Sequence, residues 1–279
     1  MSIQTLEFHG LPALRLVLPE GDSVVVARHG AQVLSWISGG AERLYLSPRA
    51  LMDGHSAIRG GVPICFPQFN QRGPLPKHGF VRNMAWQPEE TLRDAESHEF
   101  ALVLHDHDAT RAFWPHAFRA EFRVSLKPRS LRMKLTVDNT GSAPWNFAAA
   151  LHTYLRVDDI AGVKLEGLQG ANRWDAVRDD RHVEMAPALR FDAEFDSVYT
   201  SPAEGLRLVQ PSATLAIRQS ASCTETVVWN PGAQLSAKLA DMPDDGYRHM
   251  LCVEAARIDE PVQLHGGAQW KGWQELTLA

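Results

Sequence analysis

Apolar and polar residues alternate with a period of two along much of this chain, the pattern of β-strands that bury one face. The clearest case is the segment 120–140, where apolar side chains occupy every second position on both sides of a turn at Pro128–Ser130. This segment predicts a hairpin with one buried and one solvated face. Shorter strands are expected at 24–28, 32–37, 100–105, 146–157, 163–168, 206–209, 214–219, 226–229, 250–258 and 273–278.

Helical periodicity is scarce. No stretch repeats apolar residues every 3.6 positions over three turns, and only 47–53 and 88–96 could form short helices. No linker rich in Gly, Ser or Pro divides the chain, and no internal repeat is visible. We therefore expect one all-β domain over 1–279, a large sandwich or barrel of antiparallel strands.

Charge and composition limit the kinds of ligand and the location that we expect for this protein. The chain has 28 Lys and Arg against 33 Asp and Glu, and no segment gathers basic residues with aromatics between them. Nucleic-acid binding is therefore not expected as the main role. No apolar run is long enough to span a bilayer, and the first residues lack the features of a signal peptide. Because the three cysteines form no disulfide pattern, we expect a cytoplasmic protein.

A histidine in the run NFAAALHTYLRV is the first candidate for chemistry. On a strand over 146–157, His152 shares one face with Ala150 and Tyr154, as a ligand-facing surface would require. The alternative is a half-exposed strand on which His152 is an ordinary surface residue. A lone histidine does not decide between the two interpretations.

The second candidate is Glu254, in the otherwise apolar run MLCVEAARI. On a strand it shares its face with Met250, Cys252 and Ala256, none of which is polar, so a plain solvated face is disfavoured. Burial would raise the pKa of such a carboxylate toward the range useful to a general base. The alternative is an exposed position on an edge strand.

The motifs IRGGVPICFPQF and LPKHGFVRN combine glycines and prolines with positive charge. Arg59, Arg72, Lys77 and Arg82 bring four cations, and no acidic residue lies between the first and the last. Such a loop suits an anionic ligand, because arginine offers paired donors to a phosphate. The alternative is a rigid surface loop whose charges are solvated.

The run His105-Asp106-His107-Asp108 resembles a metal cluster. On a strand, His105 and His107 would share a face, but no third ligand can be placed beside them. A charged strand end is the competing interpretation, and the chain has no P-loop, dinucleotide fingerprint, Gly-x-Ser-x-Gly or His-Glu-x-x-His motif. We therefore expect neither a metal nor a cofactor.

Seven motifs, in order from residue 59 to residue 256, resemble the D-hexose-6-phosphate mutarotases of the aldose 1-epimerase superfamily. They are RGGVPICFPQF, LPKHGFVRN, ALHTYLRV, LEGLQG, EFDSVY, VVWNP and MLCVEAA. The resemblance implies the galactose mutarotase-like fold, a large antiparallel β-supersandwich. It also implies a monomeric isomerase that interconverts the α and β anomers of a hexose 6-phosphate, with glucose 6-phosphate as the expected substrate.

The resemblance also implies roles for the two candidates. Glu254 would be the general base that takes the proton from the anomeric O1, and His152 the general acid that protonates the ring oxygen. The opened aldehyde then turns about its bond and closes on its other face, with the two roles reversed. Two groups that exchange protons near neutral pH suffice for this chemistry.

The same resemblance implies the substrate contacts. Arg59 and Arg82 would bind the phosphate, Asp196 would hold sugar hydroxyls, and His78 would lie against the ring. Lys77 occupies a position where many relatives have Gln, and it could still meet the phosphate as a point charge.

Two further departures from the family pattern concern specificity. Gly232 follows VVWNP where many relatives have a bulky aromatic residue, and Trp174 stands near a position where Tyr is common. These changes leave the acid–base pair intact and affect the expected sugar preference.

Three other functions stay open at this point. A mutarotase of unphosphorylated aldoses would not need the Arg59 and Arg82 pair. A carbohydrate-binding sandwich without catalysis would not need a matched acid and base. A regulatory or metabolic-partner protein could use the fold as a scaffold.

Overall fold

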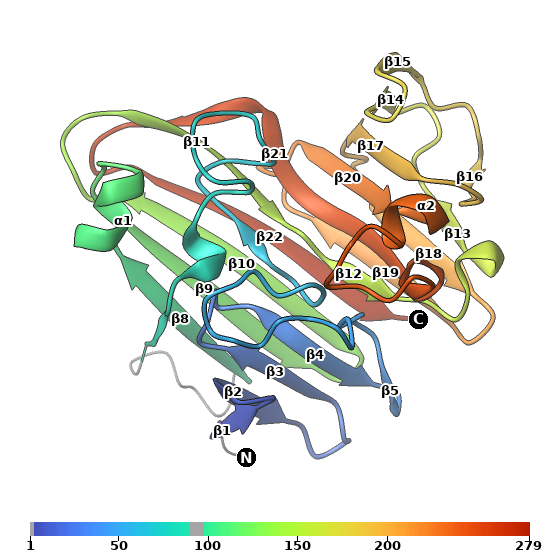
Figure 1. The fold of residues 1–279 in the computed structure, drawn as a ribbon, viewed down its shortest axis with the longest axis horizontal. Coiled ribbons are helices and arrows are strands. Elements are labelled where there is room, and N and C mark those ends of the chain that lie inside the picture. The colour runs from blue at the N-terminus through green and yellow to red at the C-terminus, as the bar shows by residue number, and fades with distance from the viewer. Residues whose placement is uncertain (1–2, 90–97) are drawn as a thin grey trace.

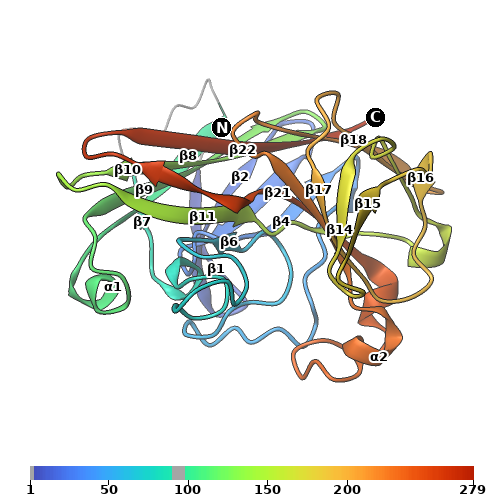
Figure 2. The same cartoon turned by 90° about the horizontal axis from the view of Figure 1, so that it is seen from above.

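Most of the chain folds into three antiparallel β-sheets with few helices (Figure 1). A computed structural model describes residues 3–89 and 98–279. The nine-stranded sheet, which contains β22, β10 and β9, lies over the eight-stranded sheet, which contains β21 and β11 (Figure 2). The all-β architecture expected from the period-two pattern is therefore confirmed.

The three sheets are formed as follows. The five-stranded sheet runs in the order β1 (Gln4–Phe8), β2 (Leu11–Val17), β3 (Ser23–Ala27), β4 (Val33–Ser38) and β5 (Ala41–Glu42). The nine-stranded sheet runs β16 (Ala188–Leu189), β13 (Lys164–Glu166), β18 (Leu206–Gln210), β19 (Ala213–Gln219), β22 (Gln269–Leu278), β10 (Ser130–Asn139), β9 (Phe118–Lys127), β8 (Glu99–His105) and β7 (Gln87–Pro88). The eight-stranded sheet runs β15 (Asp180–Val183), β14 (Asn172–Asp175), β17 (Phe195–Thr200), β20 (Glu225–Asn230), β21 (Met250–Leu264), β11 (Trp145–Leu151) and β6 (Ile64–Cys65), and β12 (Tyr154–Arg156) also pairs with β21.

The helical elements are short. They are the α-helices α1 (Asp108–Phe113) and α2 (Gly232–Ser236) and the 3₁₀ turns η1 (Val81–Asn83), η3 (Ile160–Gly162) and η4 (Gly246–His249). Within the described ranges, none of these helices has the length and apolar character needed to cross a membrane.

The predicted hairpin is the pair β9 and β10. Leu131 faces Leu126 and Met133 faces Val124 across the pair, and all four side chains are buried. The turn falls between the ends of β9 and β10, where Arg129 takes a left-handed conformation (φ 62°). The expected buried face and turn are confirmed.

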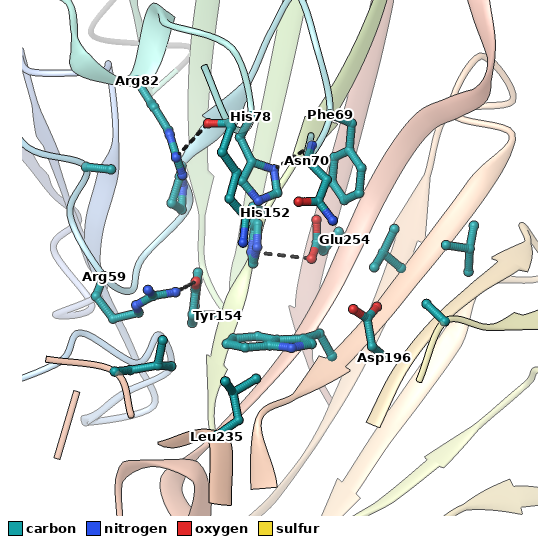
Figure 3. A pocket seen from close by; sticks show the side chains of 18 of the residues that line it. Arg59, Phe69, Asn70, His78, Arg82, His152, Tyr154, Asp196, Leu235 and Glu254 are labelled. Carbon is teal, nitrogen blue, oxygen red and sulfur yellow. Dashed lines mark hydrogen bonds and ion pairs between the residues drawn. The ribbon is translucent and has the colours of Figure 1, made fainter. Parts of the chain in front are cut away.

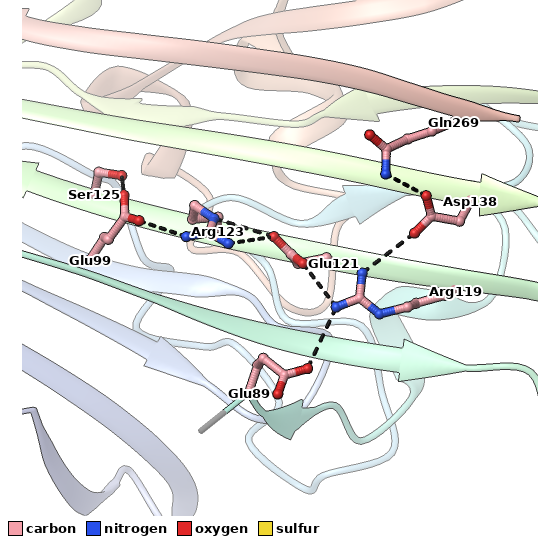
Figure 4. A network of polar contacts seen from close by, with 8 residues as sticks. All are labelled: Glu89, Glu99, Arg119, Glu121, Arg123, Ser125, Asp138 and Gln269. Carbon is pink, nitrogen blue, oxygen red and sulfur yellow. Dashed lines mark hydrogen bonds and ion pairs between the residues drawn. The ribbon is translucent and has the colours of Figure 1, made fainter. Parts of the chain in front are cut away.

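The polar face of this hairpin is organised by ion pairs (Figure 4). The carboxylate of Glu121 lies 2.9 Å from an Arg119 nitrogen and 3.0 Å from an Arg123 nitrogen. Arg119 also pairs with Asp138 on β10, and Arg123 also pairs with Glu99 on β8. The network therefore ties three neighbouring strands together and leaves Glu121 almost buried, although its face is the polar one.

The alternation of side chains along β21 decides which residues lie on the face of the eight-stranded sheet that points away from the nine-stranded sheet. Leu251 and Val253 belong to the main hydrophobic core, which joins residues of all three sheets. Cys252 and Glu254 must therefore point to the opposite face, away from the nine-stranded sheet. Loops and α2 cover this face (Figure 2).

Several sequence-based expectations need correction. Residues 47–53 form no helix: the Ser47 hydroxyl donates to the Asp241 carbonyl oxygen at 2.6 Å, and these residues lie against a distant loop. The other expected helix, 88–96, falls largely on residues 90–97, outside the described part of the chain. The expected strand 146–157 is interrupted at His152 and Thr153 and continues in the same register as β12.

Some elements were not predicted at all. The strands β1, β2, β14 and β17 have weaker alternation, and β17 carries a polar residue at its buried Ser197. Helix α1 spans only six residues, too few to show a helical period, and its start is fixed by hydrogen bonds between Thr110 and His107.

Gly61 fixes the path of the loop that carries the first motif. Its φ is +58°, and a Cβ built there would lie 2.0 Å from the carbonyl oxygen of Val33 on β4. Its own amide donates to Tyr45, and its carbonyl accepts from Tyr154 on β12. Only glycine therefore allows the loop to pass between β4 and β12.

We expect Gly61→Ala to lower the free energy of unfolding by about 3 kcal/mol or more. The cost of a left-handed backbone at alanine and the cost of overlap between the new Cβ and the Val33 backbone add together. Gly10→Ala is the matched control, since Gly10 has φ +82° but nothing within 4 Å of the added Cβ. We expect the control to lose only about 1 kcal/mol. Chemical denaturation measures both, and equal losses would contradict the role of close approach at Gly61.

Candidate active site

A pocket of about 300 Å³ opens on the face of the eight-stranded sheet that points away from the nine-stranded sheet (Figure 3). Its floor is formed by side chains of β12, β17, β20 and β21. The loop 57–82 forms one wall, and α2 with the segment after it forms another. The three sequence motifs that carried candidate chemistry therefore meet in one place.

Glu254 and His152 lie side by side on the pocket floor. The Nδ1 atom of His152 is 3.4 Å from Oε1 of Glu254, and the two residues are only 8% and 1% exposed. The interpretations of His152 as a surface residue and of Glu254 as a solvated edge position are therefore wrong. Among the described residues, neither His152 Nδ1 nor Glu254 Oε2 has a hydrogen-bond partner.

Burial acts on the two groups in opposite directions. It raises the pKa of Glu254 well above its ordinary value, and the charge of Asp196 adds to this shift. Burial lowers the pKa of His152 to about 3, and the positive charges of Arg59 and Arg82 act in the same direction. The close contact of the pair opposes both shifts, because an imidazolium beside a carboxylate stabilises both charges.

Aromatic contacts fix the ring of His152. It stacks on Tyr154 with the ring centres 4.8 Å apart and the planes 9° from parallel. Trp229 meets it edge-on at 6.1 Å and His78 at 5.4 Å. The imidazole is therefore oriented by packing rather than by a side-chain hydrogen bond.

His78 has one defined tautomer. Its Nδ1 accepts a hydrogen bond from the backbone amide of Asn70 at 3.2 Å, and the Cys65 sulfur lies 3.2 Å from the same atom. Because a backbone amide can only donate, Nδ1 must be unprotonated and the hydrogen sits on Nε2. Burial lowers the pKa of His78 far below its ordinary value, so the ring is neutral and offers one donor to the pocket.

Arg59 lines the pocket but already has protein partners. Its Nε lies 3.2 Å from both carboxylate oxygens of Asp241, and its Nη1 donates to the Tyr154 hydroxyl at 3.0 Å. A guanidinium has five N–H groups, so three remain for a ligand. Asp241 also neutralises part of the charge of Arg59.

Arg82 and Lys77 line the pocket beside each other. The Nη2 atom of Arg82 donates to the carbonyl oxygen of Lys77 at 2.8 Å. Its buried Nε has no hydrogen-bond partner among the described residues. The side chain of Lys77 is exposed. Together with Arg59, these two residues make this end of the pocket positive.

Asp196 lies on β17, and Figure 3 shows it across the pocket from the arginines. Within the described chain its carboxylate accepts no hydrogen bond from the protein, so its oxygens are available to a ligand. Burial raises its pKa, and the nearby charge of Glu194 adds to the rise. The pocket is thus divided into a positive end and an acidic end.

Sequence reasoning missed several lining residues, among them Trp229 and Asp241. Trp229 stands in the motif VVWNP, and its aromatic character beside the polar Asn230 was the available signal. Asp241 had no signal, because only the tertiary structure brings it to Arg59.

The three departures from the family pattern all lie near this pocket. Trp174 and Lys77 line it, and the guanidinium of Arg72 lies 4.8 Å above the Trp174 ring. Gly232 has φ +61°, and a Cβ there would lie 2.6 Å from the amide nitrogen of Glu194. A larger residue at 232 would therefore displace the segment next to Asp196.

The charged run at 105–108 lies elsewhere. His105 ends β8, and His107 is the N-cap residue of α1. Asp106 accepts hydrogen bonds from Arg111 and from the backbone amide of Phe118.

The sequence matches the family model described as aldose 1-epimerase over residues 13–277. A relative from Cenchrus ciliaris, named "Putative glucose-6-phosphate 1-epimerase", is 34% identical over 256 residues, which cover 88% of this chain and 78% of that protein. A relative of the same name from Escherichia coli K12 is 36% identical over 242 residues, covering 84% and 79%.

Solved structures show the same similarity. The crystal structure of a protein from Salmonella typhimurium named a "putative mutarotase" superimposes with a TM-score of 0.88 at 30% identity. The match covers 99% of this chain and 93% of that one. The galactose mutarotase-like fold implied by the sequence motifs is confirmed.

The depressed pKa of His152 makes stability depend on pH. The unfolded chain binds a proton at this residue as the pH falls through 6.5, whereas the folded chain stays neutral down to about pH 3. His152 therefore costs stability as the pH falls. Between about pH 7.5 and about pH 5 we expect the wild type to lose about 2 kcal/mol more than His152→Gln. Denaturant titrations at both pH values measure this difference, and parallel losses in the two proteins would contradict a neutral His152.

Proposed function

The chain belongs to the aldose 1-epimerase family, and from this premise we propose that it interconverts the α and β anomers of glucose 6-phosphate. The observation that carries the proposal is the buried pair of Glu254 and His152, 3.4 Å apart, in a pocket with one positive end. The pair supplies the acid and base for ring opening, and the positive end suits the phosphate.

Ring opening requires two proton transfers. Glu254 takes the proton from the anomeric O1 of the sugar, and His152 gives a proton to the ring oxygen. The C1 aldehyde turns about its bond to C2, and the reverse transfers close the ring on the other face. The pair carries one proton before and after the cycle, so no net proton is taken up from solvent.

The substrate phosphate supports the acid role of His152. Without ligand, Arg59 and Arg82 help to keep this imidazole neutral. A bound phosphate dianion offsets their charge and so raises the pKa of His152. The contact with Glu254 then favours the protonated imidazole, which is the form that donates to the ring oxygen.

The positive end has free donors for a phosphate. Arg59 keeps three N–H groups after it contacts Asp241 and Tyr154, and Arg82 has a buried Nε without a partner in the described structure. Lys77 adds a flexible charge at the mouth. Anchoring the sugar by this remote group leaves C1 free to turn.

The rest of the pocket suits the sugar ring. The Asp196 carboxylate accepts hydrogen bonds from hydroxyl groups, and the Nε2–H of neutral His78 donates one. Trp229 presents an aromatic surface on the floor, on which the C–H groups of a pyranose ring pack. These contacts hold the ring near the acid–base pair.

The proposal also covers partners and location. We propose a small sugar phosphate as the partner, a monomeric enzyme and a cytoplasmic site of action. The three cysteines are buried and unpaired, which agrees with a reducing compartment.

Anomer exchange measured by NMR tests the function directly. We expect added protein to accelerate α/β exchange of glucose 6-phosphate and to leave free glucose at its spontaneous rate. Acceleration of free glucose alone would assign the chain to neutral aldoses. If a folded sample accelerated neither sugar, the proposed reaction would be wrong.

We expect Glu254→Gln and His152→Asn each to lower kcat by roughly 10²–10⁴-fold, the range for loss of a general acid or base. Binding of glucose 6-phosphate, measured by calorimetry, should persist in both variants because the phosphate contacts are intact. Unchanged melting temperatures would exclude unfolding as the cause. Near-normal turnover in either variant would rule out the assigned role.

Arg82→Ala should raise KM for glucose 6-phosphate by about 10- to 150-fold, the loss of roughly 1.5–3 kcal/mol of a charge-assisted contact. Arg59→Ala should raise KM similarly. It is also measured in combination with Asp241→Asn, because the single variant would leave the Asp241 carboxylate without its partner. Arg49→Ala is the control, because Arg49 pairs with Asp244 at the surface and is half-exposed. Wild-type KM in both pocket variants would mean that the phosphate binds elsewhere.

A further inference from the structure

The thiol of Cys252 lies next to the acid–base pair. Cys252 is two residues before Glu254 on β21 and therefore shares its face. It is fully buried and pairs across the sheet with Tyr154, whose ring stacks on His152. The mechanism above gives Cys252 no role.

The three side chains bring three donor types together. One donor atom each of His152, Cys252 and Glu254 lies within 4.8 Å of the other two. The imidazole nitrogen and the carboxylate oxygen are already 3.4 Å apart, close to the edge of a tetrahedron with metal–ligand bonds of about 2.0–2.3 Å. The sulfur lies within 4.8 Å of both donor atoms and has to approach further for a bond to the ion.

Two of these groups also have unused bonding capacity. His152 is more than nine-tenths buried, and its Nδ1 has no hydrogen-bond partner in the described part of the chain. Glu254 is almost wholly buried, and its Oε2 lacks a partner there as well. Buried polar atoms are normally satisfied, so both point to a ligand at this position.

We propose that His152, Cys252 and Glu254 form an inhibitory site for a divalent ion of the zinc class. Nitrogen, sulfur and carboxylate oxygen are the donors that Zn²⁺ prefers, whereas Mg²⁺ and Ca²⁺ require oxygen donors. On binding, the Cys252 thiol and the His152–Glu254 pair each lose one proton to solvent, and the thiolate, the neutral imidazole and the carboxylate bond the ion. Three protein ligands leave the fourth position of a tetrahedral ion for water.

Inhibition follows from the shared atoms, and this part rests on the proposed function. An ion bound to Glu254 and His152 occupies the lone pairs that would take and return the protons of the sugar. It also stands where C1 must turn. Zn²⁺ and glucose 6-phosphate should therefore compete, so that inhibition weakens as the substrate concentration rises.

Cobalt absorption tests the site without any assay of activity. Co²⁺ replaces Zn²⁺ in such sites, and a cobalt–thiolate bond gives a charge-transfer band in the near ultraviolet. We expect the wild type to show this band at one equivalent of Co²⁺ and to lose it when Zn²⁺ is added. Absence of the band would overturn the proposal even if the protein is an active mutarotase.

Cysteine variants then locate the ligand. Loss of a group that merely supports a ligand costs 10–100-fold in metal affinity, so Cys252→Ser should weaken Zn²⁺ inhibition by roughly 100-fold or more and abolish the band. Its mutarotase rate without metal should stay near that of the wild type. Cys223→Ser is the matched control, a buried free cysteine away from the pocket, and should keep both band and inhibition.

Two results would contradict this assignment. One is unchanged Zn²⁺ inhibition or an unchanged band in Cys252→Ser. The other is loss of the band in Cys65→Ser, since Cys65 lies beside His78 and would then be the ligand. If the wild type lacks mutarotase activity, the proposed function fails, and the cobalt band still decides the metal site.

Discussion

The burial of the Glu254 carboxylate beside His152 is the constraint on which the rest of this structure depends. An isolated buried charge costs several kcal/mol, and here Oε2 has no hydrogen bond within the described protein to offset that cost. The fold keeps the group in place because β21 is paired on both sides, by β20 and by β11. A rigid central strand therefore holds a reactive side chain that an edge strand would release to water.

The electrostatics of the pocket follow from which elements supply its charged side chains. The loop 57–82 supplies cations and β17 supplies the Asp196 carboxylate, and the acid–base pair lies between these two ends (Figure 3). Fields of opposite sign at the two ends orient a molecule that carries a phosphate at one end and hydroxyl groups at the other. Asp241 moderates the positive end, because it contacts Arg59 through both of its oxygens.

The orientation of the two histidine rings in the pocket is set largely by packing. The ring of His152 is held between Tyr154, Trp229 and His78, and the tautomer of His78 is fixed by a backbone amide. Such contacts allow no large rotation of either ring. Three residues of this pocket, His152, Glu254 and Arg82, each keep a buried polar atom without a partner among the described residues. The first two of these atoms are also the ones that a competing metal ion would bind.

The sequence by itself determined the fold class, the hairpin of β9 and β10 and the candidate acid–base pair. Alternation is a local property, so it specifies which side of a strand is buried, and Glu254 in an apolar run already indicated burial with a purpose. The short helix expected at 47–53 failed because a distant loop, not a local period, decides the path there. Only the tertiary structure decided that Arg59 meets Asp241, which lies 182 residues away, and that His152 and Glu254 are neighbours. Such contacts depend on which strands and loops the fold brings together, whereas the alternation of residues fixes only the buried face of a strand and not its neighbours.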